Sequence, residues 1–145
     1  MIAGLDANLL CYVLDKRYPE HEKVKAIVLD LSAESKVALN PTIIHETYHT
    51  LVFSQKWTPE EAAEAIKVVL KNPFIEFFNQ TRKISIIALN ISVRHNLGGR
   101  DSLIVANFLS NQTPIMLTHD KALLKIQKMT WKSENLIFKD PLTEG

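Results

Sequence analysis

Hydrophobic residues fall into short continuous runs that alternate with longer segments of helical spacing. The short runs occupy residues 2–5, 37–39, 115–117 and 136–138, and residues 74–78 form a further run that only Glu76 interrupts. Continuous apolar runs of this length are typical of strands buried on both faces of a parallel sheet. The pattern therefore predicts a sheet of four to five strands, with the run at residues 136–138 as a last edge strand.

Helical patterns separate these runs. Residues 22–33 place Val24, Ile27, Val28 and Leu31 on one face, at the spacing of an amphipathic helix. Asn40-Pro41 and Thr58-Pro59 each combine a capping side chain with proline at the first helical position. Besides residues 22–33, helices are expected from near residue 8 and at residues 42–54, 59–70, 84–95, 101–109 and 120–128. Strands alternating with helices predict an α/β fold with a doubly wound parallel sheet.

Size and composition favour one compact domain over residues 1–145, because 46% of the residues are hydrophobic. The net charge of +1 gives no overall basic field that would indicate nucleic acid. The single cysteine, Cys11, lies in an apolar run, where it is expected to be buried, and a chain without a disulfide framework suits a reducing compartment.

The first apolar run contains Asp6 and follows no basic segment, so it is a poor signal peptide. No apolar stretch approaches the ~20 residues of a membrane span. The expected location is cytoplasmic, without a membrane partner.

Four acidic residues stand where a strand ends or a helix begins. Asp6 closes the first apolar run, and Asp120 follows the run at residues 115–117. Glu46 lies in the first turns of the helix after residues 37–39, and Asp101 opens an apolar helix after Gly98-Gly99. In a doubly wound sheet these positions converge on the edge formed by the carboxyl ends of the strands.

Carboxylates in one small pocket raise one another's pKa, and a bound divalent cation removes that conflict. All-oxygen ligands favour Mg²⁺ or Mn²⁺, which activate water and stabilise charge on a phosphoryl group. The predicted reaction is phosphodiester hydrolysis with water as the nucleophile. Taken singly, each acid also has an ordinary interpretation as a turn residue, a helix cap, a dipole partner or a solvated side chain.

The ordered set of segments 5–10, 44–47, 99–106 and 117–121 resembles the PIN-domain ribonucleases, and among them the VapC-type toxins of VapBC toxin–antitoxin systems. The resemblance implies a single PIN-like domain that cleaves RNA, forms a homodimer and is inhibited by a cognate antitoxin protein. It makes Asp6, Glu46, Asp101 and Asp120 the catalytic, metal-binding acids. Asn8 and Thr118 match positions that support the acids by hydrogen bonding.

Two other interpretations remain open. His45-Glu46-Thr47-Tyr48-His49 reads as H-E-x-x-H on a helix, a pattern in which His45 and His49 bind zinc and Glu46 is the general base of a peptidase. That interpretation leaves the other three acids unexplained. The remaining alternative is a catalytically silent PIN-like module that binds RNA or a protein without cleavage.

Basic residues add two weaker expectations. Lys121, Lys125, Lys128 and Lys132 recur at a spacing that would place them along one helix face, suited to RNA phosphates or to solvent. Arg100 adjoins Asp101, where it would clamp a substrate phosphate or form a salt bridge with one of the acids.

Overall fold

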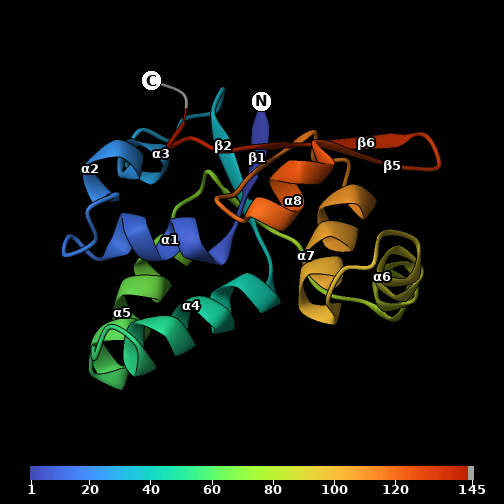
Figure 1. Cartoon of the computed structure of the whole chain (residues 1–145). Helices are drawn as coiled ribbons and strands as arrows, with labels where there is room; N and C mark the ends of the chain where they lie inside the picture. The colour runs from blue at the N-terminus through green and yellow to red at the C-terminus, as the bar shows by residue number, and fades with distance from the viewer. Residues whose placement is uncertain (144–145) are drawn as a thin grey trace.

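The computed structural model describes residues 1–143, which form an α/β domain with one central sheet (Figure 1). The strands of this part of the chain are β1 (Ile2–Leu5), β2 (Lys36–Leu39), β3 (Ile75–Phe77), β4 (Ile115–Leu117), β5 (Lys128–Trp131) and β6 (Glu134–Lys139). The helices are α1 (Ala7–Leu14), α2 (His21–Val24), α3 (Ala26–Leu29), α4 (Pro41–Phe53), α5 (Pro59–Leu70), α6 (Arg82–His95), α7 (Gly99–Ser110) and α8 (Lys121–Ile126). None of these described helices is long and apolar enough to cross a bilayer.

The sheet has the strand order β3-β2-β1-β4-β6-β5 over the described residues. Its first five strands in this order are parallel, and β5 pairs antiparallel with β6. The chain moves outward from β1 through β2 to β3, and then crosses back to β4 on the other side of β1. The point where the order reverses therefore lies between β1 and β4, which is where ligands of such sheets bind.

Local capping explains where several helices begin. The side chain of Asn40 accepts a hydrogen bond from the backbone N–H of Ile43, and Pro41 occupies the first turn of α4. Thr58 and Glu61 form a reciprocal capping box at the start of α5. Asp120 accepts hydrogen bonds from two backbone N–H groups of α8. The predicted helix starts at these three positions are confirmed.

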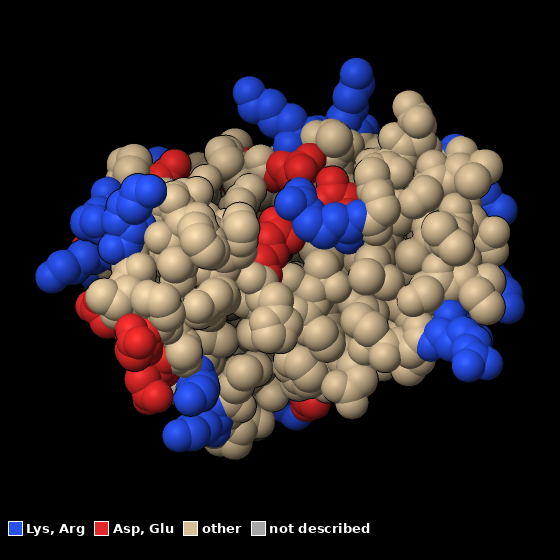
Figure 2. Space-filling view, turned by 90° about the horizontal axis from the view of Figure 1, so that it is seen from below, with Lys and Arg blue, Asp and Glu red and all other residues tan. Residues whose placement is uncertain are grey.

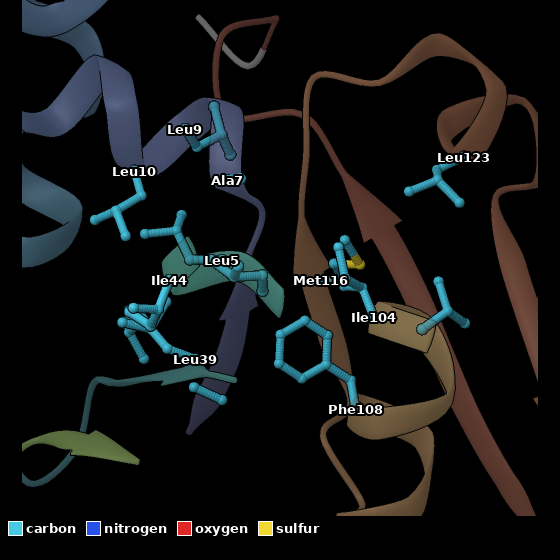
Figure 3. Close-up of a cluster of buried hydrophobic side chains, with 14 of the residues drawn as sticks. Leu5, Ala7, Leu9, Leu10, Leu39, Ile44, Ile104, Phe108, Met116 and Leu123 are labelled. Atoms are coloured by element: carbon cyan, nitrogen blue, oxygen red, sulfur yellow. The ribbon is translucent and has the colours of Figure 1, made fainter. Parts of the chain in front are cut away.

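The core lies where α1, α4 and α7 pack on the sheet, and its labelled side chains come from residues far apart in the sequence (Figure 3). Phe108 of α7 is fully buried against β1. A Cβ atom on Gly4 would lie 2.5 Å from Cε2 of Phe108, so only glycine lets α7 approach the sheet this closely. Cys11 is buried in this core, as predicted.

The C-terminal part of the sheet differs from the prediction. α8 ends at Ile126, and Gln127 has a positive φ of 71° before the chain enters β5. Met129 is buried between exposed neighbours, which is the alternation of a strand. β5 is therefore the edge strand and β6 lies inside the sheet, so the described sheet has six strands where four to five were expected.

The predicted lysine stripe on one helix is wrong for the same reason. Lys121 and Lys125 belong to α8, Lys128 begins β5, and Lys132 lies in the turn of the β5–β6 hairpin with a φ of 54°.

Two other predicted elements have different bounds. The helix expected at residues 22–33 is two short helices, α2 and α3, followed by a turn in which Ser32 and Ser35 exchange backbone hydrogen bonds. The break assigned to Gly98-Gly99 begins earlier, because α6 ends at Asn96 in the left-handed conformation. Gly99 is already the first residue of α7.

Asp15 joins the loop after α1 to the loop after α4. Its carboxylate accepts hydrogen bonds from the guanidinium of Arg17 at 2.9 and 3.1 Å, from the Gln55 amide at 3.0 Å and from the Trp57 indole at 2.9 Å. Burial alone would raise the pKa of this carboxyl, but these donors outweigh it and hold the pKa well below its usual range.

We predict that Gly4→Ala lowers the free energy of unfolding by about 1–3 kcal/mol, because the added methyl group displaces the Phe108 ring. Urea denaturation of the purified chain measures the change. Gly99→Ala is the matched control, since nothing lies within 4 Å of a Cβ atom there. Equal unfolding midpoints for Gly4→Ala and the wild type would contradict the close packing of α7 on β1.

Candidate functional site

Asp6 and Thr118 follow the two strands that flank the reversal point of the sheet. The hydroxyl of Thr118, after β4, donates a hydrogen bond of 2.7 Å to Oδ2 of Asp6, after β1. The same hydroxyl accepts a hydrogen bond of 3.0 Å from the backbone N–H of Asp120. Both Asp6 and Thr118 are buried. Because Oδ1 of Asp6 also accepts from the N–H of Ala7 at 2.7 Å, this carboxylate is held in one orientation.

Glu46 and Asp101 come from α4 and α7 and meet at one guanidinium. Nη1 of Arg100 lies 3.1 Å from Oε1 of Glu46, and Nη2 lies 3.5 Å from Oδ1 of Asp101. α4 belongs to the connection between β2 and β3, and α7 to the connection between β3 and β4. Both helices begin near the carboxyl ends of the strands, so Glu46 and Asp101 lie at the same edge of the sheet. Figure 2 shows acidic side chains grouped near the centre of this edge, with a basic side chain against them.

The pKa values show that the carboxylates interact. Burial raises the pKa of Asp6, and the charges of Asp101 and Asp120 raise it further, against the lowering effect of its hydrogen bonds. Burial likewise raises the pKa of Glu46, with Asp6 and Asp101 adding to the effect and Arg100 opposing it. Burial and the charge of Asp120 raise the pKa of Asp101, again against Arg100. The structure thus brings the four acids predicted from the sequence into one electrostatic cluster, which we call the acidic site.

The acidic site has the oxygen donors of a divalent cation site. Oε2 of Glu46 is buried and has no hydrogen-bond partner among the described residues. In residues 1–143 no three His, Cys, Asp or Glu side chains are arranged closely enough to form a complete ligand set. Arg100 instead supplies the positive charge between Glu46 and Asp101. The residues therefore fit a hard cation by their negative charge and their oxygen atoms. Arg100 partly neutralises the charges of Glu46 and Asp101.

Arg100 forms salt bridges with two acids, one of the two roles expected for it. Its side chain is 60% exposed, so it can also reach a ligand from solvent. Asn8 is exposed on α1, and none of the hydrogen bonds among the described residues joins its side chain to an acid. Its supporting role stays a prediction.

The histidines of the H-E-x-x-H segment lie on α4, as expected, and both are exposed. His45 lines a mostly apolar hollow of about 440 Å³ between α4 and α5. The ring of His49 packs against Phe53 with centroids 4.8 Å apart. In the described part of the chain no further histidine, cysteine or acid joins this pair to make a three-ligand zinc site.

One side-chain hydrogen bond beside the acidic site was not predicted. Nδ1 of His119 lies 2.7 Å from Oδ2 of Asp140, which is buried just after β6. Asp140 therefore follows the carboxyl end of a parallel strand, as Asp6 does. The same rule would have found it, had residues 136–138 been placed inside the sheet.

The model of the PIN domain family matches residues 4–129. The fold is similar to that of Mycobacterium tuberculosis VapC20, described as a sarcin-ricin loop cleaving toxin, with a TM-score of 0.69, 15% identity and coverage of 83% of this chain and 91% of that one. It is also similar to the Rickettsia felis VapBC2 complex bound to a promoter DNA fragment, with a TM-score of 0.67, 15% identity and coverage of 97% and 98%.

A further solved structure, FitAcB from Neisseria gonorrhoeae, matches with a TM-score of 0.60, 16% identity and coverage of 99% of both chains. At such identities these likenesses show a common fold. No curated protein matches the sequence of this chain.

We predict that Asp101→Asn stabilises the metal-free protein at pH 8. The raised pKa of Asp101 means that the folded wild type loses stability as the pH rises through that pKa, by about 1.4 kcal/mol for each unit of the shift. The neutral amide avoids this loss, so the two proteins should converge near pH 4. Thermal unfolding in chelator from pH 4 to 8 measures the difference.

The exposed Glu34 provides a control for the loss of one negative charge. Glu34→Gln should follow the wild type across the whole range. A constant gap between Asp101→Asn and the wild type at all pH values would show that the pKa of Asp101 is not raised in the folded protein.

Proposed function

Because the chain belongs to the PIN domain family, we propose that it is a ribonuclease that hydrolyses RNA phosphodiester bonds at the acidic site with Mg²⁺ or Mn²⁺. The observation that carries the proposal is the cluster of Asp6, Glu46 and Asp101, whose pKa values are all raised by burial and further by the charges of neighbouring acids of the site. Side chains that destabilise one another in the absence of a ligand are typical of functional sites.

In this proposal Asp6, Glu46 and Asp101 hold the cation, and Asp120 contributes negative charge from the other side of Thr118. A divalent cation bound there supplies activation of water and stabilisation of charge on the phosphoryl group. Thr118 orients Asp6 through its hydrogen bond, so that this carboxylate keeps one position. Arg100 turns from the acids to a phosphate oxygen of the RNA, for which its guanidinium has matching geometry.

The biological setting belongs to the same proposal. The structures similar in fold include a toxin and two further structures, named VapBC2 and FitAcB. We extend this to the present chain as a cytoplasmic toxin that acts as a homodimer and is inhibited by a cognate antitoxin. The support is similarity of fold together with an acidic site that an inhibitor could cover.

The two alternatives have less support in the structure. A zinc peptidase would use His45 and His49, whose exposed rings have no third ligand beside them in the described chain. A silent module would need no reactive acids, yet Asp6, Glu46 and Asp101 remain ionisable and crowded.

We predict that Asp6→Asn lowers RNA cleavage by at least about 100-fold, because the fixed carboxylate of the cation site is lost. The measurement uses labelled RNA with Mg²⁺ or Mn²⁺, with and without chelator, and chelator should abolish wild-type cleavage. Asp6→Asn should also lose the increase in melting temperature that Mn²⁺ gives the wild type.

His49→Ala is the matched control and should stay largely active. Cleavage of a peptide that needs His49 and zinc but tolerates Asp6→Asn would favour the peptidase. RNA binding without cleavage by the wild type would favour the silent module. Equal cleavage by Asp6→Asn and the wild type would exclude the acidic site as the place of RNA cleavage or reveal a contaminating nuclease.

We predict that expression of the wild-type chain arrests bacterial growth and that expression of Asp6→Asn does not. If an adjacent gene encodes a small antitoxin, co-expression of that protein should restore growth. If cells that contain the folded wild-type chain grew as fast as cells without it, the chain would not be a toxin, and a nuclease would have another role.

A further inference from the structure

A groove outside the acidic site runs between α6 and the β5–β6 hairpin. Two hollows, of about 350 and 620 Å³, share the side chains of Lys83, Ile87, Trp131 and Lys132. Trp131 is half-buried at the end of β5 and lines both hollows, so they form one continuous groove along its ring. We call this the α6–hairpin groove.

The groove is basic. Lys83 and Lys132 are exposed on its two walls, and the guanidinium of Arg94 lies 4.9 Å from the centroid of the Trp131 ring. Glu134 is the one acid among the described residues that line the two hollows. Since the whole chain carries a net charge of only +1, this groove is a local concentration of positive charge.

The groove also has polar groups without partners. The indole nitrogen of Trp131 and the hydroxyl of Ser110 are buried, and neither has a hydrogen-bond partner among the described residues. Both residues line the smaller hollow. A buried polar group without a partner destabilises the protein, and a polar ligand that reached these atoms would recover that free energy.

The groove lies near the amino end of β6, whereas the acidic site lies at the carboxyl ends of the strands. Trp131 pairs with Glu134 at the start of β6, whereas Lys139 at the end of β6 accepts a hydrogen bond from the backbone N–H of Thr118. The six residues of β6 therefore separate the two regions by roughly 15–20 Å at the rise of a strand. A ligand that reaches both must be an extended polymer.

From these features we infer that the α6–hairpin groove is a second binding site for single-stranded RNA, in which a base stacks beside Trp131 and phosphates pair with Lys83 and Lys132. An aromatic ring between cations is the arrangement by which proteins hold single-stranded nucleic acid without reading its sequence. The inference rests on the proposed ribonuclease function, and it places part of the substrate well away from the acids.

The test measures RNA binding in chelator, so it does not depend on cleavage. Anisotropy of a labelled single-stranded oligouridine about 20 nucleotides long gives the Kd for the full chain. Trp131→Ala and the double variant Lys83→Ala/Lys132→Ala should each raise the Kd about tenfold. The double variant should also flatten the slope of log K against log salt by about 1.4, for two lost phosphate contacts on a single strand.

Two variants serve as controls. Trp131→Phe keeps a stacking ring, so it should bind within about twofold of the wild type while losing the tryptophan quenching that RNA causes. Lys67→Ala/Lys71→Ala removes the same charge from α5 and its C-cap residue, on the opposite side of the molecule (Figure 1), and should leave the Kd unchanged. Circular dichroism checks folding, and the lysine variants decide the matter if Trp131→Ala does not fold.

Unchanged binding in the lysine double variant would overturn the inference, as would an equal loss in the α5 control. Competition by poly-glutamate as effective as that by RNA would also overturn it, because the groove would then be a site for any polyanion. Binding through the groove without cleavage by the wild type would leave this inference intact and remove the proposed nuclease function. RNA cleavage by the wild type, together with unchanged RNA binding by the groove variants, would support the nuclease function and overturn this inference.

Discussion

Electrostatic repulsion between carboxylates at one edge of a parallel sheet is the constraint around which this molecule is organised. Parallel strands end at a common edge, so residues that follow β1 and β4 must meet there, and α4 and α7 begin at the same edge. The fold holds Asp6, Glu46 and Asp101 close together although burial, and to a lesser extent the charges of neighbouring acids, oppose ionisation. Arg100 and the Thr118 hydroxyl reduce this repulsion without removing it.

The sequence was sufficient to predict the parallel sheet, most helices and the convergence of the acids, because strand ends can be located from short apolar runs. It was not sufficient for the β5–β6 hairpin. The lysines from residue 121 to 132 have helical spacing, while the strand signal there is a single buried Met129 and the half-buried Trp131. Arg100 was recognised as a salt-bridge candidate, but its simultaneous contact with Glu46 depends on the angle between α4 and α7, which no local pattern encodes.

Misplacing β6 at the edge also hid two features. Asp140 was not recognised as a strand-end acid, and the α6–hairpin groove did not exist in the predicted fold. Both features depend on the pairing of β6 with β4 and β5, which the hydrophobic pattern of the sequence does not reveal. The regions that the sequence described poorly are thus those in which the structure brings together α6, α7 and the hairpin around Trp131.

Asp15 lies outside the acidic site, yet its hydrogen bonds join the ends of α1 and α4, the two helices next to Asp6 and Glu46. It ties the end of α1, which begins at Asp6, to the segment after α4, which carries Glu46. Loss of the Asp15 carboxylate would therefore remove a support shared by α1 and α4 while leaving every side chain of the acidic site in place.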